Sequence, residues 1–141
     1  MDFGYSGKSV IVTGGASNIG RRMVHTFARE GANVTFADLD TEQGDAVMQE
    51  AQALGDGQVQ FSKTDVTDLV QVEAMVAAAK ESFGAVDVLV NNVGWDELMF
   101  FTQTAPAFWD KVIKINYISV LNCTRAVLAP MIEQQRGAIV S

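Results

Sequence analysis

The chain has 141 residues, of which 48% are hydrophobic and 19% charged, enough apolar material for one globular domain with a core of its own. Its formal net charge of −7 disfavours nucleic acid as a partner, because phosphate backbones are bound by clustered lysines and arginines. The single cysteine, Cys123, excludes an internal disulfide and is expected to be a small buried apolar residue.

Patterns typical of strands and of helices alternate along the chain. Continuous apolar runs predict five strands that are buried on both faces. Apolar residues at helical spacing predict a helix after each of the first four strands, with Thr41 and Thr67 as N-caps. The strands are expected at 9–13, 32–38, 59–65, 86–92 and 137–141, and the helices at 19–31, 41–54, 67–84 and roughly 105–134.

This alternation predicts an α/β fold, a Rossmann-like doubly wound parallel sheet with the strand order 3-2-1-4-5. Helices then cover both faces of the sheet, and we expect the helix after the fourth strand to change face. In such sheets ligands bind beyond the carboxyl ends of the strands, where the strand order reverses. The expected site is therefore the crevice between the first and fourth strands.

The segment Ile11–Arg22, IVTGGASNIGRR, joins the first predicted strand to the first predicted helix. The N-terminus of a helix presents unpaired N–H groups and the positive end of the helix dipole, which favour a phosphate. Gly14 and Gly20 flank the turn, and glycines let a phosphate approach the backbone closely. Because a strand precedes this loop and a helix follows it, the pattern predicts a pyrophosphate-binding loop.

The second predicted strand ends at an acidic residue, Asp38, eighteen residues after Gly20. A carboxylate at this strand end can accept both ribose hydroxyls of an adenosine, and it repels a 2′-phosphate. The sequence therefore predicts NAD rather than NADP as the cofactor. The alternative role of Asp38 is to cap the turn into the next helix, for which Thr41 is the better candidate.

Four elements of the sequence together resemble the classical short-chain dehydrogenases/reductases, over the whole chain and in register. The loop Thr13-Gly14-x-x-x-Asn18-Ile19-Gly20 resembles the TGxxxGxG loop of that family. The other three elements are Asn92-Val93-Gly94, which is similar to the family's NNAG element, Asp65-Val66 after the third strand, and Asn116 in the long helix.

Two positions depart from the family's pattern. Asn18 stands where the family has its middle glycine, and asparagine tolerates left-handed backbone angles better than other non-glycine residues. Val93 replaces the usual alanine and keeps the wall beneath the nicotinamide ribose apolar. We expect both departures to leave cofactor binding intact. Ser17 carries no positive charge where NADP-preferring members often do, in agreement with the prediction from Asp38.

The resemblance implies a cofactor contact at each matched position. The loop would hold the pyrophosphate, the tip of the second strand the adenosine ribose, the residues after the third strand the adenine, and the tip of the fourth strand the inner ribose. The pyrophosphate would contact Gly14, Ser17, Asn18, Ile19 and Gly20. The adenosine ribose would contact Asp38 and Leu39, and the adenine Asp65 and Val66. The inner ribose would contact Asn92, Val93 and Gly94. No metal site is expected, because the lone His25 has no partner ligands.

The family transfers a hydride between the nicotinamide and a secondary alcohol or ketone. A tyrosine serves as acid and base, a lysine lowers its pKa, a serine polarises the substrate oxygen, and a helix asparagine holds a water. Of these four only the asparagine has a counterpart here, Asn116, and no Tyr-x-x-x-Lys occurs in the 141 residues. We therefore expect residues 1–141 to be the N-terminal NAD-binding part of a longer NAD-dependent oxidoreductase, inactive by itself. The alternative is a non-catalytic NAD-binding module.

The segment after the fourth strand, WDELMFFTQTAPAFW, is rich in aromatic residues. In the family this loop borders the substrate pocket, so it favours a hydrophobic or cyclic alcohol or ketone; alternatively, these residues only pack the loop on the long helix. The segment also resembles family members that oxidise alicyclic hydroxyacyl-CoA rings, of the 2-hydroxycyclohexanecarboxyl-CoA dehydrogenase type. The excess of apolar residues on the long helix predicts a second buried contact, either a homo-oligomer (a dimer or homotetramer) or the remainder of the same chain.

The expected location follows from the N-terminus and from the lengths of the apolar runs. The first residues lack the basic start and apolar core of a signal peptide. No apolar run approaches the ~18 residues of a membrane span. We therefore expect a cytoplasmic protein without a membrane partner.

Overall fold

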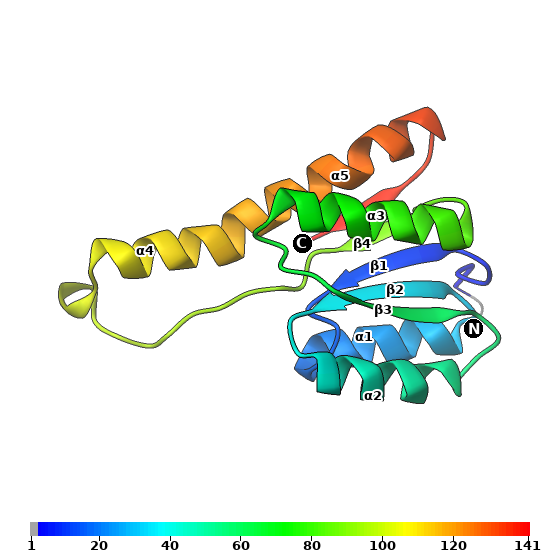
Figure 1. Ribbon diagram of the computed structural model, residues 1–141, viewed down its shortest axis with the longest axis horizontal. Helices are drawn as coiled ribbons and strands as arrows, with labels where there is room; N and C mark the ends of the chain where they lie inside the picture. The colour runs from blue at the N-terminus through cyan, green and yellow to red at the C-terminus, as the bar shows by residue number, and fades with distance from the viewer. Residues whose placement is uncertain (1–2) are drawn as a thin grey trace.

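The computed structural model describes residues 3–141 and places five strands in one parallel sheet (Figure 1). The strands lie in the order β3-β2-β1-β4-β5, which confirms the predicted order. The central strand β1 (Ser9–Thr13) is buried along its whole length, as expected for a strand covered on both faces. The others are β2 (Asn33–Asp38), β3 (Val59–Lys63), β4 (Val88–Val90) and β5 (Ala138–Val140), all of them shorter than predicted and β4 the most.

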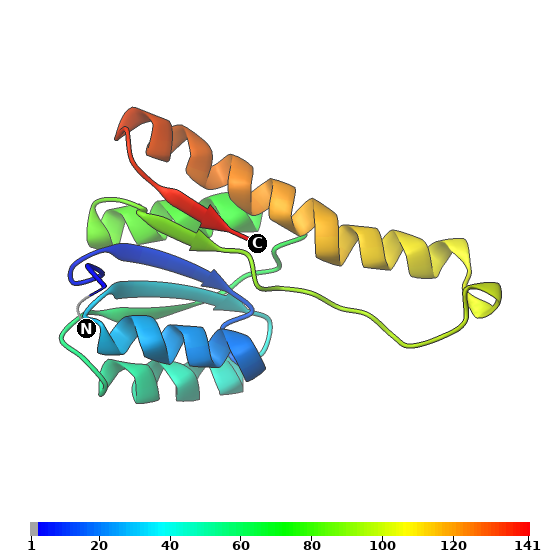
Figure 2. The ribbon, with the colours of Figure 1, turned by 180° about the vertical axis from the view of Figure 1, so that it is seen from behind.

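Helices cover both faces of the sheet (Figures 1 and 2). α1 (Asn18–Arg29) and α2 (Thr41–Gln52) pack on one face, and α3 (Leu69–Phe83) and α5 (Ser119–Glu133) pack on the other. Successive side chains of β1 point to opposite faces, so Val10 and Val12 join the core beneath α1 and α2, whereas Ile11 joins the core beneath α3 and α5.

The helix that changes face is α3, so the expectation that the helix after β4 does so was wrong. The chain moves outward from β1 through β2 to the edge strand β3, and α3 then returns across the sheet to β4. A right-handed crossover that reverses its direction along the sheet must use the opposite face. From β4 the chain continues in the new direction, and α5 therefore lies on the same face as α3, against which it packs.

Two helix N-caps also differ from the prediction. The N-cap of α2 is Asp40, whose side chain accepts a hydrogen bond from the Gln43 N–H, and not Thr41. The N-cap of α3 is Asp68 and not Thr67. In both cases a threonine stands beside an aspartate, and the carboxylate takes the free N–H groups of the first turn.

The long predicted helix consists of three consecutive parts. α4 (Pro106–Ile113) leads into a π-helical turn (Lys114–Ile118) and then into α5, which continues past Pro130 to Glu133. By length and composition alone the run Pro106–Glu133 could cross a membrane, contrary to the expectation of no such run. A single helix that meets this criterion is weak evidence for a membrane span, and 17% of its most apolar window is buried in the structure. α4 and the preceding segment extend away from the sheet (Figures 1 and 2).

Candidate functional site

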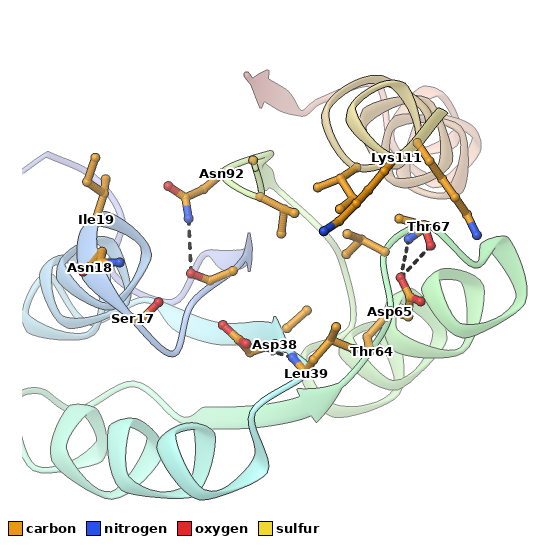
Figure 3. A pocket seen from close by; sticks show the side chains of 17 residues that line it. Ser17, Asn18, Ile19, Asp38, Leu39, Thr64, Asp65, Thr67, Asn92 and Lys111 are labelled. Atoms are coloured by element: carbon orange, nitrogen blue, oxygen red, sulfur yellow. Dashed lines mark hydrogen bonds between the residues drawn. The ribbon is translucent and has the colours of Figure 1, made fainter. Parts of the chain in front are cut away.

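A pocket of about 610 Å³ lies at the carboxyl ends of β1 to β4, in the predicted crevice (Figure 3). It is lined by Gly14, Ser17, Asn18, Ile19, Ala37, Asp38, Leu39, Thr64, Asp65, Val66, Thr67, Asn92, Val93, Gly94, Lys111, Lys114 and Ile115. All the predicted cofactor contacts are in this lining except Gly20, which is buried behind the loop. The structure therefore brings together, from four strand ends, residues that lie far apart in the sequence.

The loop between β1 and α1 has the backbone shape that the sequence predicts. Gly14 has a φ of +66°, and Asn18 has a φ of +48°, the left-handed conformation expected of an asparagine at this position. A Cβ on Gly20 would overlap the carbonyl oxygen of Gly14. Ser17 is the N-cap of α1, and its side chain makes no capping hydrogen bond. Free N–H groups at the start of α1 thus face the pocket beside Ser17 and Asn18.

Asn92 joins the end of β4 to this loop. Its Nδ2 donates hydrogen bonds to the carbonyl oxygens of Thr13, at 3.0 Å, and of Gly14, at 3.2 Å (the latter drawn in Figure 3). The buried Thr13 hydroxyl accepts in return from the N–H groups of Asn92, at 2.9 Å, and Val93, at 3.2 Å. These four bonds fix the two strand ends on either side of the crevice.

Asp38 lies at the tip of β2 and makes three hydrogen bonds to backbone N–H groups. Its Oδ2 accepts from Ala16 at 3.0 Å, and its Oδ1 accepts from Leu39 at 2.8 Å and from Asp40 at 3.2 Å. A carboxylate offers about four acceptor positions, so one remains on Oδ2 for a ligand. Acceptance of both ribose hydroxyls, as the sequence analysis expected, would require one backbone bond to break. The bonds from Leu39 and Asp40 lie in the turn before α2, so Asp38 also holds this turn, which was its alternative role in the sequence analysis.

Asp65 and Val66 form the part of the pocket that follows β3. The Asp65 Oδ1 accepts from the N–H of Thr67 at 2.9 Å and from its hydroxyl at 2.7 Å (Figure 3). The Val66 carbonyl accepts from the Asn122 side chain in α5 at 3.2 Å. This turn is therefore rigidly held, and the apolar Val66 side chain is buried against the core while it lines the pocket.

Asn116 lies outside the pocket lining, in the π-helical turn between α4 and α5. Its side chain binds the backbone of Trp95: Oδ1 accepts from the Trp95 N–H at 2.9 Å, and Nδ2 donates to the Trp95 carbonyl at 2.6 Å. Nδ2 also donates to the Val112 carbonyl at 3.0 Å. Asn116 thus anchors the segment after β4 to the helix, and π-helical turns of this kind are frequent at functional sites.

The sequence analysis missed two basic residues of the pocket, Lys111 and Lys114. The Lys111 side chain reaches from α4 into the pocket (Figure 3), and its ammonium group lies 3.5 Å from the centroid of the Trp95 ring. Both lysines are close to Asn116 on the same helix, a spacing that could have suggested them. The lining also contains Asp38 and Asp65, so it carries charges of both signs.

His25 and Cys123, which the sequence analysis singled out, both lie outside the pocket. His25 packs between α1 and α2 with its Nε2 3.3 Å from the Glu50 carboxylate, and burial lowers its pKa. Burial raises the pKa of Cys123 to about 12, so its thiol is the buried apolar group that was expected. Among residues 3–141 no three His, Cys, Asp or Glu side chains gather as metal ligands would.

Comparison with known proteins identifies the family. A model described as short chain dehydrogenase matches residues 8–141, and the chain therefore belongs to the short-chain dehydrogenase family. It is 37% identical over 96% of its length to the 3-oxoacyl-[acyl-carrier-protein] reductase FabG of Thermotoga maritima, covering 54% of that protein. It is 33% identical over 98% of its length to the (2S)-[(R)-hydroxy(phenyl)methyl]succinyl-CoA dehydrogenase subunit BbsD of Thauera aromatica, covering 55% of it.

Solved structures of the family have the same fold. A short-chain dehydrogenase/reductase from Burkholderia xenovorans superposes with a TM-score of 0.90 at 34% identity, over 96% of this chain and 55% of that one. A metagenomic short-chain oxidoreductase in complex with NADP superposes with a TM-score of 0.89 at 30% identity, over 96% of this chain and 61% of that one. The chain spans about half the length of the curated relatives that it matches.

Proposed function

We propose that this chain forms the cofactor-binding part of an NAD-dependent oxidoreductase, which transfers a hydride between NAD and a secondary alcohol or ketone. The observation that carries the proposal is the pocket, in which the glycine loop, Asp38, Asp65 and the Asn92–Gly94 segment meet at the topological switch point of the sheet. Membership of the short-chain dehydrogenase family supports the same conclusion.

The residues present fit a nicotinamide dinucleotide. A Cβ on Gly14 would lie 3.1 Å from Asn92 Nδ2 and 3.2 Å from Val93 Cγ2, so the glycine keeps the floor of the pocket open. The N–H groups beside Ser17 and Ile19 would hold the pyrophosphate, while Asp65 and Val66 would border the adenine. When bound, the nicotinamide supplies the carbon that gives or accepts the hydride.

Asp38 supports NAD rather than NADP. Its carboxylate has one free acceptor position for a ribose hydroxyl and would repel a 2′-phosphate. The NADP bound in one solved relative is a property of that protein. The two basic residues of the lining, Lys111 and Lys114, come from α4 and the π-helical turn that follows it, and the labelled Lys111 lies on the opposite side of the pocket from Asp38 (Figure 3).

The proposed catalytic role of Asn116 is to hold a water in a proton relay. Its side-chain amide already donates to two carbonyl groups, of Trp95 and Val112, so a water would be held by its backbone carbonyl or by the remaining acceptor position of Oδ1. The serine, tyrosine and lysine of the family's mechanism would lie in a part of the protein beyond these residues.

The substrate class that we propose is a hydrophobic or cyclic alcohol or ketone, with an alicyclic hydroxyacyl-CoA as the first candidate. The segment after β4 carries exposed aromatic side chains, Phe100 and Phe101, and its Trp95 ring contacts the ammonium group of the pocket-lining Lys111. The likeness to BbsD, which is by name a subunit of a dehydrogenase acting on (2S)-[(R)-hydroxy(phenyl)methyl]succinyl-CoA, supports this class. The exposed apolar face of α5, which includes Leu121, Leu128 and Ile132, supports a homo-oligomer.

The test is an oxidation assay with the full-length protein. Cyclic hydroxyacyl-CoA esters and simple secondary alcohols are offered with NAD or with NADP, and formation of the reduced cofactor is followed by its absorbance. We expect turnover with NAD and a preference for cyclic substrates. Tight binding of NADH without turnover of any substrate would favour the second candidate, a non-catalytic NAD-binding module.

A further inference from the structure

The Asp38 carboxylate connects two backbone segments of the site that are separate in the sequence. Its Oδ2 accepts from the Ala16 N–H in the glycine loop, 22 positions away, and its Oδ1 accepts from the two N–H groups that follow it, of Leu39 and Asp40. The carboxylate therefore ties the loop after β1 to the turn after β2.

The Ala16 bond is one of two hydrogen bonds that join the middle of this loop to the end of β2. The neighbouring Gly15 N–H donates to the Ala37 carbonyl at 3.0 Å, and these two bonds fix the loop against the tip of β2. Ala16 itself is buried, so without the carboxylate its N–H would be left without an acceptor. Because the loop contains Gly14 and Gly15, ordering its backbone costs a large conformational entropy. Each hydrogen bond that holds the loop offsets part of that cost.

We propose that Asp38 is a positioning residue for the phosphate-binding loop in addition to its contact with the adenosine ribose. One carboxylate then couples recognition of the ribose to the shape of the loop that receives the pyrophosphate. This inference rests on the proposed function, because it assumes a dinucleotide in the pocket. It follows that Asp38→Ala, made to admit NADP, weakens binding of the diphosphate shared by both cofactors.

The test uses 2′,3′-dideoxy-ADP, which has adenine and a diphosphate but no ribose hydroxyl, as a ligand of the full-length protein. If Asp38 contacted only the ribose, Asp38→Ala would leave the affinity for this probe unchanged or raise it, since a negative charge near the diphosphate is removed. We expect a loss of affinity of about tenfold, the size of one broken hydrogen bond to a buried N–H. Asp38→Asn keeps one acceptor oxygen for N–H groups that the carboxylate binds with both of its oxygens, so it should recover only part of the affinity.

A matched control and a second measurement complete the test. Asp40→Ala removes the same charge two positions along the chain without touching the loop, and it should not weaken binding of the probe. In the cofactor-free protein, the Ala16 amide should exchange its hydrogen at least about tenfold faster in Asp38→Ala than in the wild type.

The outcomes separate this inference from the proposed function. Unchanged or tighter binding of dideoxy-ADP by Asp38→Ala, with unchanged exchange at Ala16, would overturn the positioning role. Failure of the wild-type protein to bind NADH or ADP would instead overturn the proposed function, and the exchange rate of Ala16 would still decide the positioning role.

Discussion

Asn92 is the residue whose substitution tests the two-sided construction of the pocket most clearly. Its Nδ2 donates to the carbonyl oxygens of Thr13 and Gly14 at 3.0 and 3.2 Å. Asn92→Asp keeps the size of the side chain but places an oxygen against these two oxygens. Each lost hydrogen bond contributes about 0.5–1.5 kcal/mol, and the repulsion adds to their sum. We expect the free energy of unfolding to fall by about 2–4 kcal/mol near neutral pH.

Urea unfolding of the full-length protein measures this change as a shift of the midpoint at constant slope. The matched control is Asn91→Asp, because within residues 3–141 the Asn91 Nδ2 donates to the Ser141 hydroxyl alone, at 3.2 Å. This substitution should cost less than about 1 kcal/mol. The two carbonyl oxygens should raise the pKa of the carboxyl introduced by Asn92→Asp above its unfolded value of about 3.9. Its protonated form can donate one bond, so the stability deficit should shrink as the pH falls through the raised pKa. Equal effects of the two substitutions near neutral pH would refute the proposed link between β4 and the loop.

Three further predictions concern single residues. Asn18→Val should lower the free energy of unfolding by about 1–2 kcal/mol, whereas Asn18→Gly should be nearly neutral, because φ is +48° at this position; equal urea midpoints for the two variants would contradict this. Asp40→Ala should lower that free energy by about 1 kcal/mol and Thr41→Ala by clearly less, since Asp40 caps α2; the reverse order would contradict the assignment. Burial raises the pKa of Cys123 to about 12, so a thiolate-selective reagent should label the thiol near pH 8 only after denaturation, and fast labelling of the native protein would disprove its burial.

The sheet was predictable because apolar periodicity and the glycine loop both report on local backbone structure. The run Ser9–Thr13 is apolar on both faces, and it is the central strand. The face of each helix was harder to predict, because it depends on the direction of each crossover and not on the local pattern. Each predicted N-cap was wrong by one residue: the cap of α2 is Asp40, just before Thr41, and the cap of α3 is Asp68, just after Thr67. Capping propensity alone does not choose between two adjacent residues that can both cap a helix.

The cofactor side of the pocket was largely predictable, since motif positions at strand ends converge when the sheet is parallel. Gly14, Asp38 and Asn92 line one pocket although they belong to different motifs. The sequence did not reveal which groups of the protein itself the polar side chains of the pocket contact. The three backbone bonds of Asp38 depend on the tertiary fold, and so does the placement of Lys111 over the Trp95 ring.

The measurement that tests the central claim most directly is a calorimetric titration of the full-length protein with NADH and, separately, with NADPH. The proposed function predicts that NADH binds at least about tenfold more tightly, because the Asp38 carboxylate repels the 2′-phosphate. Equal or tighter binding of NADPH would contradict the assignment of NAD. Failure to bind either nucleotide would contradict the assignment of the pocket itself.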